Sequence, residues 1–259
     1  MSDIEYSVDE HVATILLNRP AKKNAFTTEM IDEWARFLVG LRTDRRVRAV
    51  VLTGAGGAFC SGADLGDLAE EVTPLGRKRH LTDHIHRIAY ALEDLEQPVI
   101  AAVEGPAVGA GMDMALMCDL RVISETARFC EAYVKVGLVP GDGGCYFLPR
   151  LVGIARALEL LWTGRFVEAD EALRIGLANR LVPAGQALIE ARALAAQLAA
   201  APPVAIGMIK RATYQSARVD MRTALNLVSS DMGIVRATED SRQAMQSFRE
   251  RRTADYQGR

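Results

Sequence analysis

Two glycine-rich segments each follow a short apolar run that is typical of a buried strand. One covers residues 58–65 after a run that ends at Thr53, and the other covers residues 104–113 after a run that ends at Val103. Small side chains let a ligand approach the main chain closely. If a helix begins at about Ala110, its first amides are unpaired and its dipole is positive there, so the two segments together could stabilise an oxygen that gains negative charge.

Asp113 is the charged residue best placed to act beside those amides. It lies three residues into the expected helix, on the same side as Ala110, and its Cβ leans back toward the helix start. This placement predicts a general base. The alternative is a purely structural role, with the glycines forming tight turns and Asp113 favoured by the helix dipole.

Other motifs of catalysis and metal binding are incomplete in this sequence. Residues 57–62 have the glycine spacing of a phosphate loop, but Ala63 stands where such a loop requires Lys. No dinucleotide-binding glycine motif follows a strand, and neither GxSxG nor HExxH occurs. His80, His84 and His86 share one expected helix, where a polar solvated face is favoured over a histidine lining a cleft, and no metal is expected.

The composition describes an ordinary globular protein. The 259 residues carry 31 Lys and Arg against 33 Asp and Glu, a formal charge of −2, and are 49% hydrophobic. This balance disfavours nucleic acid as the main partner. We expect no membrane span, because no run approaches about 18 apolar residues. The sequence start lacks the features of a signal peptide, and four scattered cysteines without a CxxC pair favour a reducing, cytoplasmic setting.

Hydrophobic patterning predicts an α/β core followed by helices. A hairpin is expected from residues 4–8 and 12–17, a helix begins after Thr27, and buried strands cover 47–53 and 99–103. From residue 153 strand signals nearly vanish and alanine-rich helical stretches follow one another. We expect a catalytic core over residues 1–200 and a helical region over 201–259, in which the arginine-rich tail after Phe248 forms an exposed helix end.

Five ordered segments resemble the signature of the crotonase superfamily, the enoyl-CoA hydratase/isomerase group. They are residues 19–26 (RPAKKNAF), 59–65 (FCSGADL), 105–113 (GPAVGAGMD), 118–119 (CD) and 137–144 (GLVPGDGG). The resemblance implies an α/β spiral of repeated ββα units, a helical C-terminal trimerisation region, and a homotrimer or a dimer of trimers. It also implies an oxyanion hole formed by the backbone N–H groups of Ala63 and Ala110, which would hold an acyl-CoA thioester as an enolate-like species.

The same resemblance suggests how coenzyme A, as part of the substrate, would be held. Its nucleotide end would meet Lys22 or Lys23 and the loop residues Cys60, Ser61, Ala63, Asp64 and Leu65. Phe248 and Arg251 occupy positions that in relatives meet the cofactor or an adjoining subunit. For the two lysines a solvated surface role is equally expected, because a flexible point charge meets a phosphate weakly. No further cofactor is implied.

The chain departs from the family pattern at the catalytic positions. A typical hydratase has two glutamates that hold one water, and here the matching residues are Asp113 and Tyr133. Tyrosine is neutral near pH 7, so Tyr133 can orient water or donate a hydrogen bond but is a poor base. Glu131, two residues earlier, or Asp142, in the glycine turn 141–144, could supply the second carboxylate.

Three functions follow from these residues. The first is hydration of a 2-enoyl-CoA to a 3-hydroxyacyl-CoA by Asp113 with help from Asp142 or Glu131. The second is double-bond isomerisation, for which Asp113 alone would suffice as acid and base. The third is a non-catalytic acyl-CoA binder, which would keep the amide pair and the trimer but would need no base.

Overall fold

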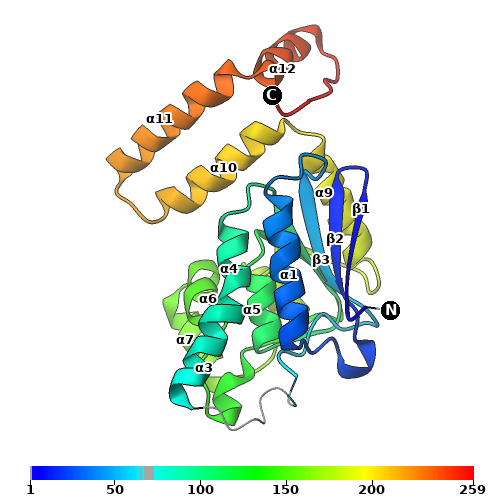
Figure 1. Ribbon diagram of the computed structural model, residues 1–259, viewed down its shortest axis with the longest axis vertical. Helices are drawn as coiled ribbons and strands as arrows, with labels where there is room; N and C mark the ends of the chain where they lie inside the picture. The colour runs from blue at the N-terminus through cyan, green and yellow to red at the C-terminus, as the bar shows by residue number, and fades with distance from the viewer. Residues whose placement is uncertain (1, 65, 67–72) are drawn as a thin grey trace.

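The computed structural model of the protein describes residues 2–64, 66 and 73–259 (Figure 1). Its strands are β1 (Ile4–Asp9), β2 (Val12–Leu17), β3 (Ala49–Gly54), β4 (Val99–Val103), β5 (Pro106–Val108), β6 (Leu120–Ser124), β7 (Arg128–Cys130), β8 (Val167–Glu168) and β9 (Arg180–Val182). Its helices are η1 (Pro20–Lys22), α1 (Thr28–Leu41), α3 (Pro74–His80), η2 (Leu81–Ile85), α4 (His86–Glu93), α5 (Ala110–Leu116), η3 (Ala132–Val136), α6 (Gly144–Val152), α7 (Ile154–Thr163), α8 (Ala169–Arg174), α9 (Ala187–Ala199), α10 (Pro203–Ser216), α11 (Met221–Ala237) and α12 (Glu239–Glu250).

A six-stranded sheet forms the centre of the fold, in the order β1-β2-β3-β4-β6-β9. The expected hairpin is confirmed, since β1 pairs antiparallel with β2, and the remaining pairs are parallel. Strands β3 and β4 are almost entirely buried. Continuous apolar strands of this kind are typical of a parallel sheet covered on both faces.

Helices cover the two faces of this sheet with different side chains. On one face Val50 and Leu52 pack with α1, whose Trp34 is 1% exposed, and with α4 (Figure 1). On the other face Val51 packs with α9, which presents the small residue Ala195. Successive strand residues therefore serve opposite faces, as the two-residue period of a strand requires.

A small second sheet brings the glycine-rich segments together. It has the order β5-β7-β8, and β5 runs directly before α5. The first segment joins its edge through a bridge between Cys60 and Ala107. A second bridge links Phe26 to Ala63. Three parts of the chain that are distant in sequence thus meet at the start of α5.

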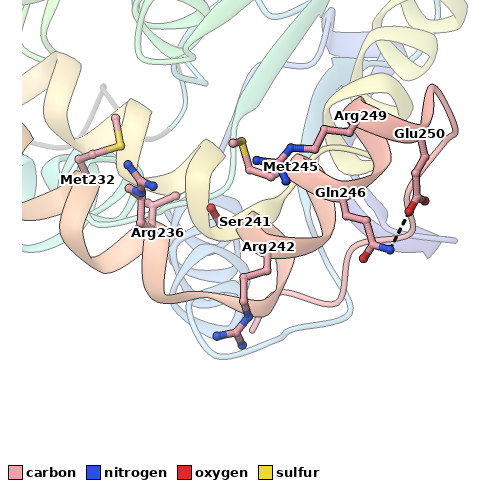
Figure 2. Close-up of a pocket in the computed structure, with 9 residues that line it drawn as sticks. Met232, Arg236, Ser241, Arg242, Met245, Gln246, Arg249 and Glu250 are labelled. Carbon is pink, nitrogen blue, oxygen red and sulfur yellow. Dashed lines mark hydrogen bonds between the residues drawn. The ribbon is translucent and has the colours of Figure 1, made fainter.

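The last three helices, α10 to α12, extend away from the sheet (Figure 1). Large apolar side chains on them face outward, with Met221 73%, Leu225 59% and Phe248 86% exposed. Figure 2 shows a groove between α11 and α12 whose lining includes Arg236, Met245 and Arg249. The predicted helical character of this region is confirmed.

The C-terminal part differs from the sequence expectations in two details. Short strands β8 and β9 do occur after residue 153, and they are too short to show a strand pattern in sequence. The tail does not simply end an exposed helix. After α12 the chain turns back, and the Arg48 guanidinium donates a hydrogen bond to the Tyr256 carbonyl at 2.8 Å.

Among the described helices, none by itself has the length and apolar content to cross a membrane. The bent pair α9 and α10 meets that test jointly, with an angle of 107° between the two helices.

Asp119 fastens the C-terminal helices to the sheet. One carboxylate oxygen accepts from the Val99 amide at 2.7 Å and lies 2.8 Å from the Lys210 ammonium, while the other accepts from the Tyr214 hydroxyl at 2.9 Å. Val99 begins β4, and both other partners belong to α10. The second residue of the sequence motif 118–119 therefore serves as an anchor between the two parts.

Replacing this anchor should loosen α10. We expect Asp119→Ala to lower the free energy of unfolding by about 2–3 kcal/mol, because hydrogen bonds to a largely buried charge are lost, and to speed amide hydrogen exchange within α10. The control Asp94→Ala removes an exposed ion pair with Arg42 and should change stability by less than about 0.5 kcal/mol. Equal effects of the two substitutions would contradict the anchoring role.

Candidate active site

The amides of Ala63 and Ala110 are both available to a ligand. The Phe26 amide donates to the Gly62 carbonyl at 3.0 Å and the Asp64 amide donates to the Phe26 carbonyl at 2.9 Å, which leaves the Ala63 N–H on the other side of the bridge. Ala110 is the first residue of α5, where amides have no partner within the helix. Neither N–H donates a hydrogen bond to the part of the chain that the structure describes.

Three glycines allow the segments to come close enough. A Cβ on Gly62 would lie 3.6 Å from the Ala110 nitrogen, so the two amide-bearing segments are in contact. A Cβ on Gly111 would lie 2.2 Å from the Cys60 carbonyl oxygen, a distance no side chain tolerates. Gly109 has φ +53°, a conformation that favours glycine, and its carbonyl accepts the amide of Asp113 at 3.0 Å. The predicted start of α5 at Ala110 is confirmed.

Three buried carboxyl groups gather beside this helix start. Asp113 is 0%, Glu131 2% and Asp142 6% exposed. A Cβ on Gly144 would lie 2.6 Å from Asp113 Oδ1 and 2.8 Å from Glu131 Oε1, so both carboxyls lie within 2.8 Å of one point. The structure therefore brings together the three acidic residues that the sequence singled out.

Tyr133 completes the group by donating its hydroxyl hydrogen to Asp113 Oδ2 at 2.6 Å. Glu131 and Tyr133 do not lie along one strand. Glu131 precedes η3, and Tyr133 lies within that short helix. This short helix lets both side chains approach α5.

Burial sets the protonation of the four groups. It raises the pKa of Asp113 to about 6, an effect opposed by the Tyr133 hydrogen bond. Burial, followed by the charge of Asp113, raises the pKa of Asp142 to about 7. The same two causes, followed by a hydrogen bond with Asp113, raise the pKa of Glu131 far above the usual range. Burial also raises the pKa of Tyr133, which stays a neutral donor.

This arrangement suits proton transfer next to a developing negative charge. Near neutral pH Asp113 is mostly ionised, Asp142 exchanges its proton readily, and Glu131 holds its proton. Two backbone amides that need no reorganisation stand at the start of the same helix. The described residues contain no cluster of metal-binding side chains.

The segment around Lys22 and Lys23 lies against the loop that carries Ala63. The Ser61 hydroxyl donates to the Lys22 carbonyl at 3.1 Å and its amide donates to the Lys23 carbonyl at 2.9 Å. Both lysine side chains are exposed. The Gly66 amide, and after it the Arg19 guanidinium at 2.9 Å, hold the pKa of Asp64 below its usual range.

Two predicted coenzyme A contacts have a different setting. Cys60 is 0% exposed and its thiol donates to the Asn24 carbonyl at 3.1 Å. Its side chain therefore points into the protein and is not offered to a ligand. Leu65 lies outside the described residues.

Phe248 and Arg251 lie at α12, which stands apart from α5 and α6 (Figure 1). The chain does not bring these two residues to its own carboxyl cluster. Contact with a neighbouring subunit's ligand stays a prediction.

Asn24 is a supporting residue to which sequence reasoning assigned no role. Its side-chain amide donates to the carbonyls of Ala55 and Ala58 at 2.8 Å each, and its carbonyl oxygen accepts the Arg19 amide at 2.9 Å. Asn24 also has φ +57°, which Asn tolerates better than most residues. The only sequence signal for this role was the position of Asn24 within the motif 19–26.

Comparison with known proteins identifies the family of this chain. A family model described as Enoyl-CoA hydratase/isomerase matches residues 7–259. The chain belongs to this family. It is 39% identical over 242 residues to a short-chain-enoyl-CoA hydratase of Clostridium acetobutylicum, covering 93% of this chain and 92% of the relative. It is 33% identical over 259 residues to 2,3-dehydroadipyl-CoA hydratase of Escherichia coli, covering both chains fully.

Solved structures in the enoyl-CoA hydratase/isomerase family share the whole fold. The crystal structure of an enoyl-CoA hydratase from Bacillus anthracis superposes with a TM-score of 0.95 at 34% identity and covers 100% of each chain. The predicted crotonase-type α/β fold with C-terminal helices is thereby confirmed.

The space above Gly144 should tolerate no side chain. We expect Gly144→Ala to lower the free energy of unfolding by about 1–3 kcal/mol, because the added methyl overlaps two buried carboxyls. The control Gly40→Ala, in the open on α1, should raise stability by about 0.5–1 kcal/mol through helix propensity. Denaturant unfolding measures both, and a stabilising Gly144→Ala would contradict the packing described.

The Tyr133 hydroxyl should hold down the pKa of Asp113. Tyr133→Phe removes a donor to the charged carboxylate, so the pKa of Asp113 should rise above about 6. Carboxyl carbon-13 NMR of labelled aspartates measures this titration, with the exposed Tyr90→Phe as the control that leaves it in place. An unchanged or lower pKa in Tyr133→Phe would refute the assignment.

Proposed function

We propose that the protein adds water across the double bond of a 2-enoyl-CoA thioester to form a 3-hydroxyacyl-CoA. The observation that carries this proposal is the pair of buried carboxyls, Asp113 and Asp142, whose pKa values of about 6 and about 7 lie near neutrality beside two unpaired amides. Hydration needs both a base for water and an acid for carbon. Relatives at 33–39% identity named as enoyl-CoA hydratases support the same chemistry.

The thioester carbonyl oxygen would accept hydrogen bonds from the Ala63 and Ala110 amides. As water adds, electron density moves from the double bond to that oxygen, and the enolate-like species is stabilised by the amides and by the positive end of α5. Both amides are fixed before substrate arrives, by the Phe26 bridge and by Gly109.

Asp113 is the proposed base and Asp142 the proposed acid. The Tyr133 hydroxyl donates to Asp113 Oδ2 and favours its ionised form, so Asp113 takes a proton from water while the water oxygen bonds to carbon 3. Asp142, when protonated, gives its proton to carbon 2 as the enolate collapses. A proton passing from Asp113 back to Asp142 restores the starting state. Glu131 stays neutral, so it adds no second negative charge beside Asp113.

Substrate holding and assembly complete the proposal. Lys22 or Lys23 would meet phosphate oxygens of coenzyme A, which enters as part of the substrate and with no further cofactor. Residues 1–200 would form the catalytic core, and residues 201–259 would join subunits into a trimer or a dimer of trimers. The outward apolar side chains of α10 to α12 support this, and Phe248 and Arg251 would then approach a neighbouring subunit's ligand. The four free thiols agree with a cytoplasmic setting.

Double-bond isomerisation is the second candidate, favoured by one contact. Tyr133 stands where the family pattern has the second glutamate, and it donates to Asp113 rather than acting as a base. Asp113 alone would then remove a proton from one carbon of the acyl chain and return it to another. A non-catalytic binder would need no buried base, so the carboxyl cluster argues against it.

Substitution of each carboxyl tests the proposal. Asp113→Asn and Asp142→Asn should each lower kcat at least about 100-fold on a panel of 2-enoyl-CoA thioesters, with smaller effects on KM. Product is identified by a mass gain of one water. Asp94→Asn, an exposed residue, is the matched control.

Two outcomes would overturn the hydratase assignment. If Asp113→Asn loses activity, Asp142→Asn keeps it, and the unmodified protein forms a product with a shifted double bond, the protein is an isomerase. Turnover within about tenfold of the unmodified protein for both Asn variants would remove these carboxyls from the reaction.

A further inference from the structure

The turn that carries Asp142 is built almost entirely of glycine. Gly141 precedes Asp142, and Gly143 and Gly144 follow it, with Gly143 at φ +130°. Glycine restricts the backbone least of all residues, so this sequence does not by itself hold the Asp142 side chain in one direction. Contacts from outside the turn must do so.

His86 supplies one such contact. This first residue of α4 lies with its Nε2 2.9 Å from the carbonyl oxygen of Gly141. A carbonyl only accepts hydrogen bonds, so Nε2 must carry the hydrogen. The carbonyl of Gly141 and the amide and Cα of Asp142 belong to one planar peptide unit. Holding that oxygen therefore holds the plane from which the Asp142 side chain projects.

Leu81 supplies the second contact, on the same helical segment. A Cβ on Gly141 would lie 3.3 Å from both terminal methyl carbons of Leu81. The π-helical turn η2 begins at Leu81 and ends just before His86, and the His86 amide donates to the Leu81 carbonyl. This bond links residues five apart and places Leu81 and His86 one above the other on the helical segment. Both side chains therefore reach Gly141. Single π-turns inside helices occur frequently at functional sites.

We propose that His86 is a positioning residue for Asp142, and that its ring N–H fixes the Gly141–Asp142 peptide so that the Asp142 carboxyl stays buried beside Asp113. The catalytic consequence rests on the proposed function of Asp142, whereas the effect on its burial does not. Two of the three histidines of the sequence pattern thus differ in role. His84 pairs with Asp32 on α1 at 3.0 Å.

The groups that face Asp142 come from several elements. Asp113 on α5 acts on it electrostatically, and Asp142 in turn acts on Tyr133 of η3 and on the Cys60 thiol. Beside His86 lies the ring of Tyr90, with 6.2 Å between the ring centres. Freed from His86, the Asp142 carboxyl would turn toward water, and the pKa that burial raises to about 7 would fall toward the ordinary value.

Two His86 variants and one matched control test this role without substrate. His86→Phe keeps a ring but removes the N–H, His86→Gln restores an amide N–H at a comparable reach, and His84→Phe removes the other histidine contact. Carboxyl carbon-13 NMR should show the Asp142 titration shifted to lower pH in His86→Phe only. An unshifted titration in a folded His86→Phe protein would overturn the proposal.

A double-mutant cycle tests the catalytic consequence. His86→Phe should lower kcat about tenfold with KM within about twofold, and His86→Gln should recover most of that loss. In the Asp142→Asn background His86→Phe should have no further effect. Equal losses in both backgrounds would overturn the positioning role. If the unmodified protein hydrates no enoyl-CoA, the proposed function fails, and the NMR titration still decides the role of His86.

Discussion

Removing a carboxylate from water is costly unless hydrogen bonds replace the solvent, and this chain buries three carboxyl groups in one place. Asp113 recovers part of that cost from the Tyr133 hydroxyl, whereas Glu131 keeps its proton beside the charge of Asp113. Asp142 lies between these cases, affected by both burial and the nearby charge of Asp113. Three residues of similar chemistry thereby acquire three different proton affinities, and acid–base catalysis depends on that spread.

The rest of the fold brings these groups and the amide pair into contact. Parallel strands β3 and β4 end at the same edge of the sheet, and ligand sites of α/β folds lie beyond such strand ends. Beyond that edge, glycines at 62, 109, 111 and 144 replace side chains wherever backbone or carboxyl groups approach too closely for a Cβ or need φ above zero. Asp119 and Asn24 act at longer range, by joining α10 to β4 and the segment 19–26 to the loop after β3.

Local pattern was enough to predict the first four strands of the central sheet, the start of α5 and the candidate base Asp113, because strand burial and helix starts leave signals within a few residues. The short strands β8 and β9 left no such signal in the sequence. Asp142 and Glu131 could be proposed but not placed, since their distance from Asp113 depends on how α6 packs against α5. His86 was equally undetectable as a partner of the glycine turn, because the contact joins residues 55 apart. Its histidine neighbours made a solvated face the simpler interpretation.

The central claim is that two carboxyls and two amides add water to an activated double bond. It is tested most directly by incubating the protein with 2-enoyl-CoA thioesters in water enriched in both oxygen-18 and deuterium, with the products analysed by mass spectrometry. We expect a 3-hydroxyacyl-CoA that carries oxygen-18 at carbon 3 and one carbon-bound deuterium at carbon 2. Carbon-bound deuterium in a product with a moved double bond and no oxygen-18 would contradict it.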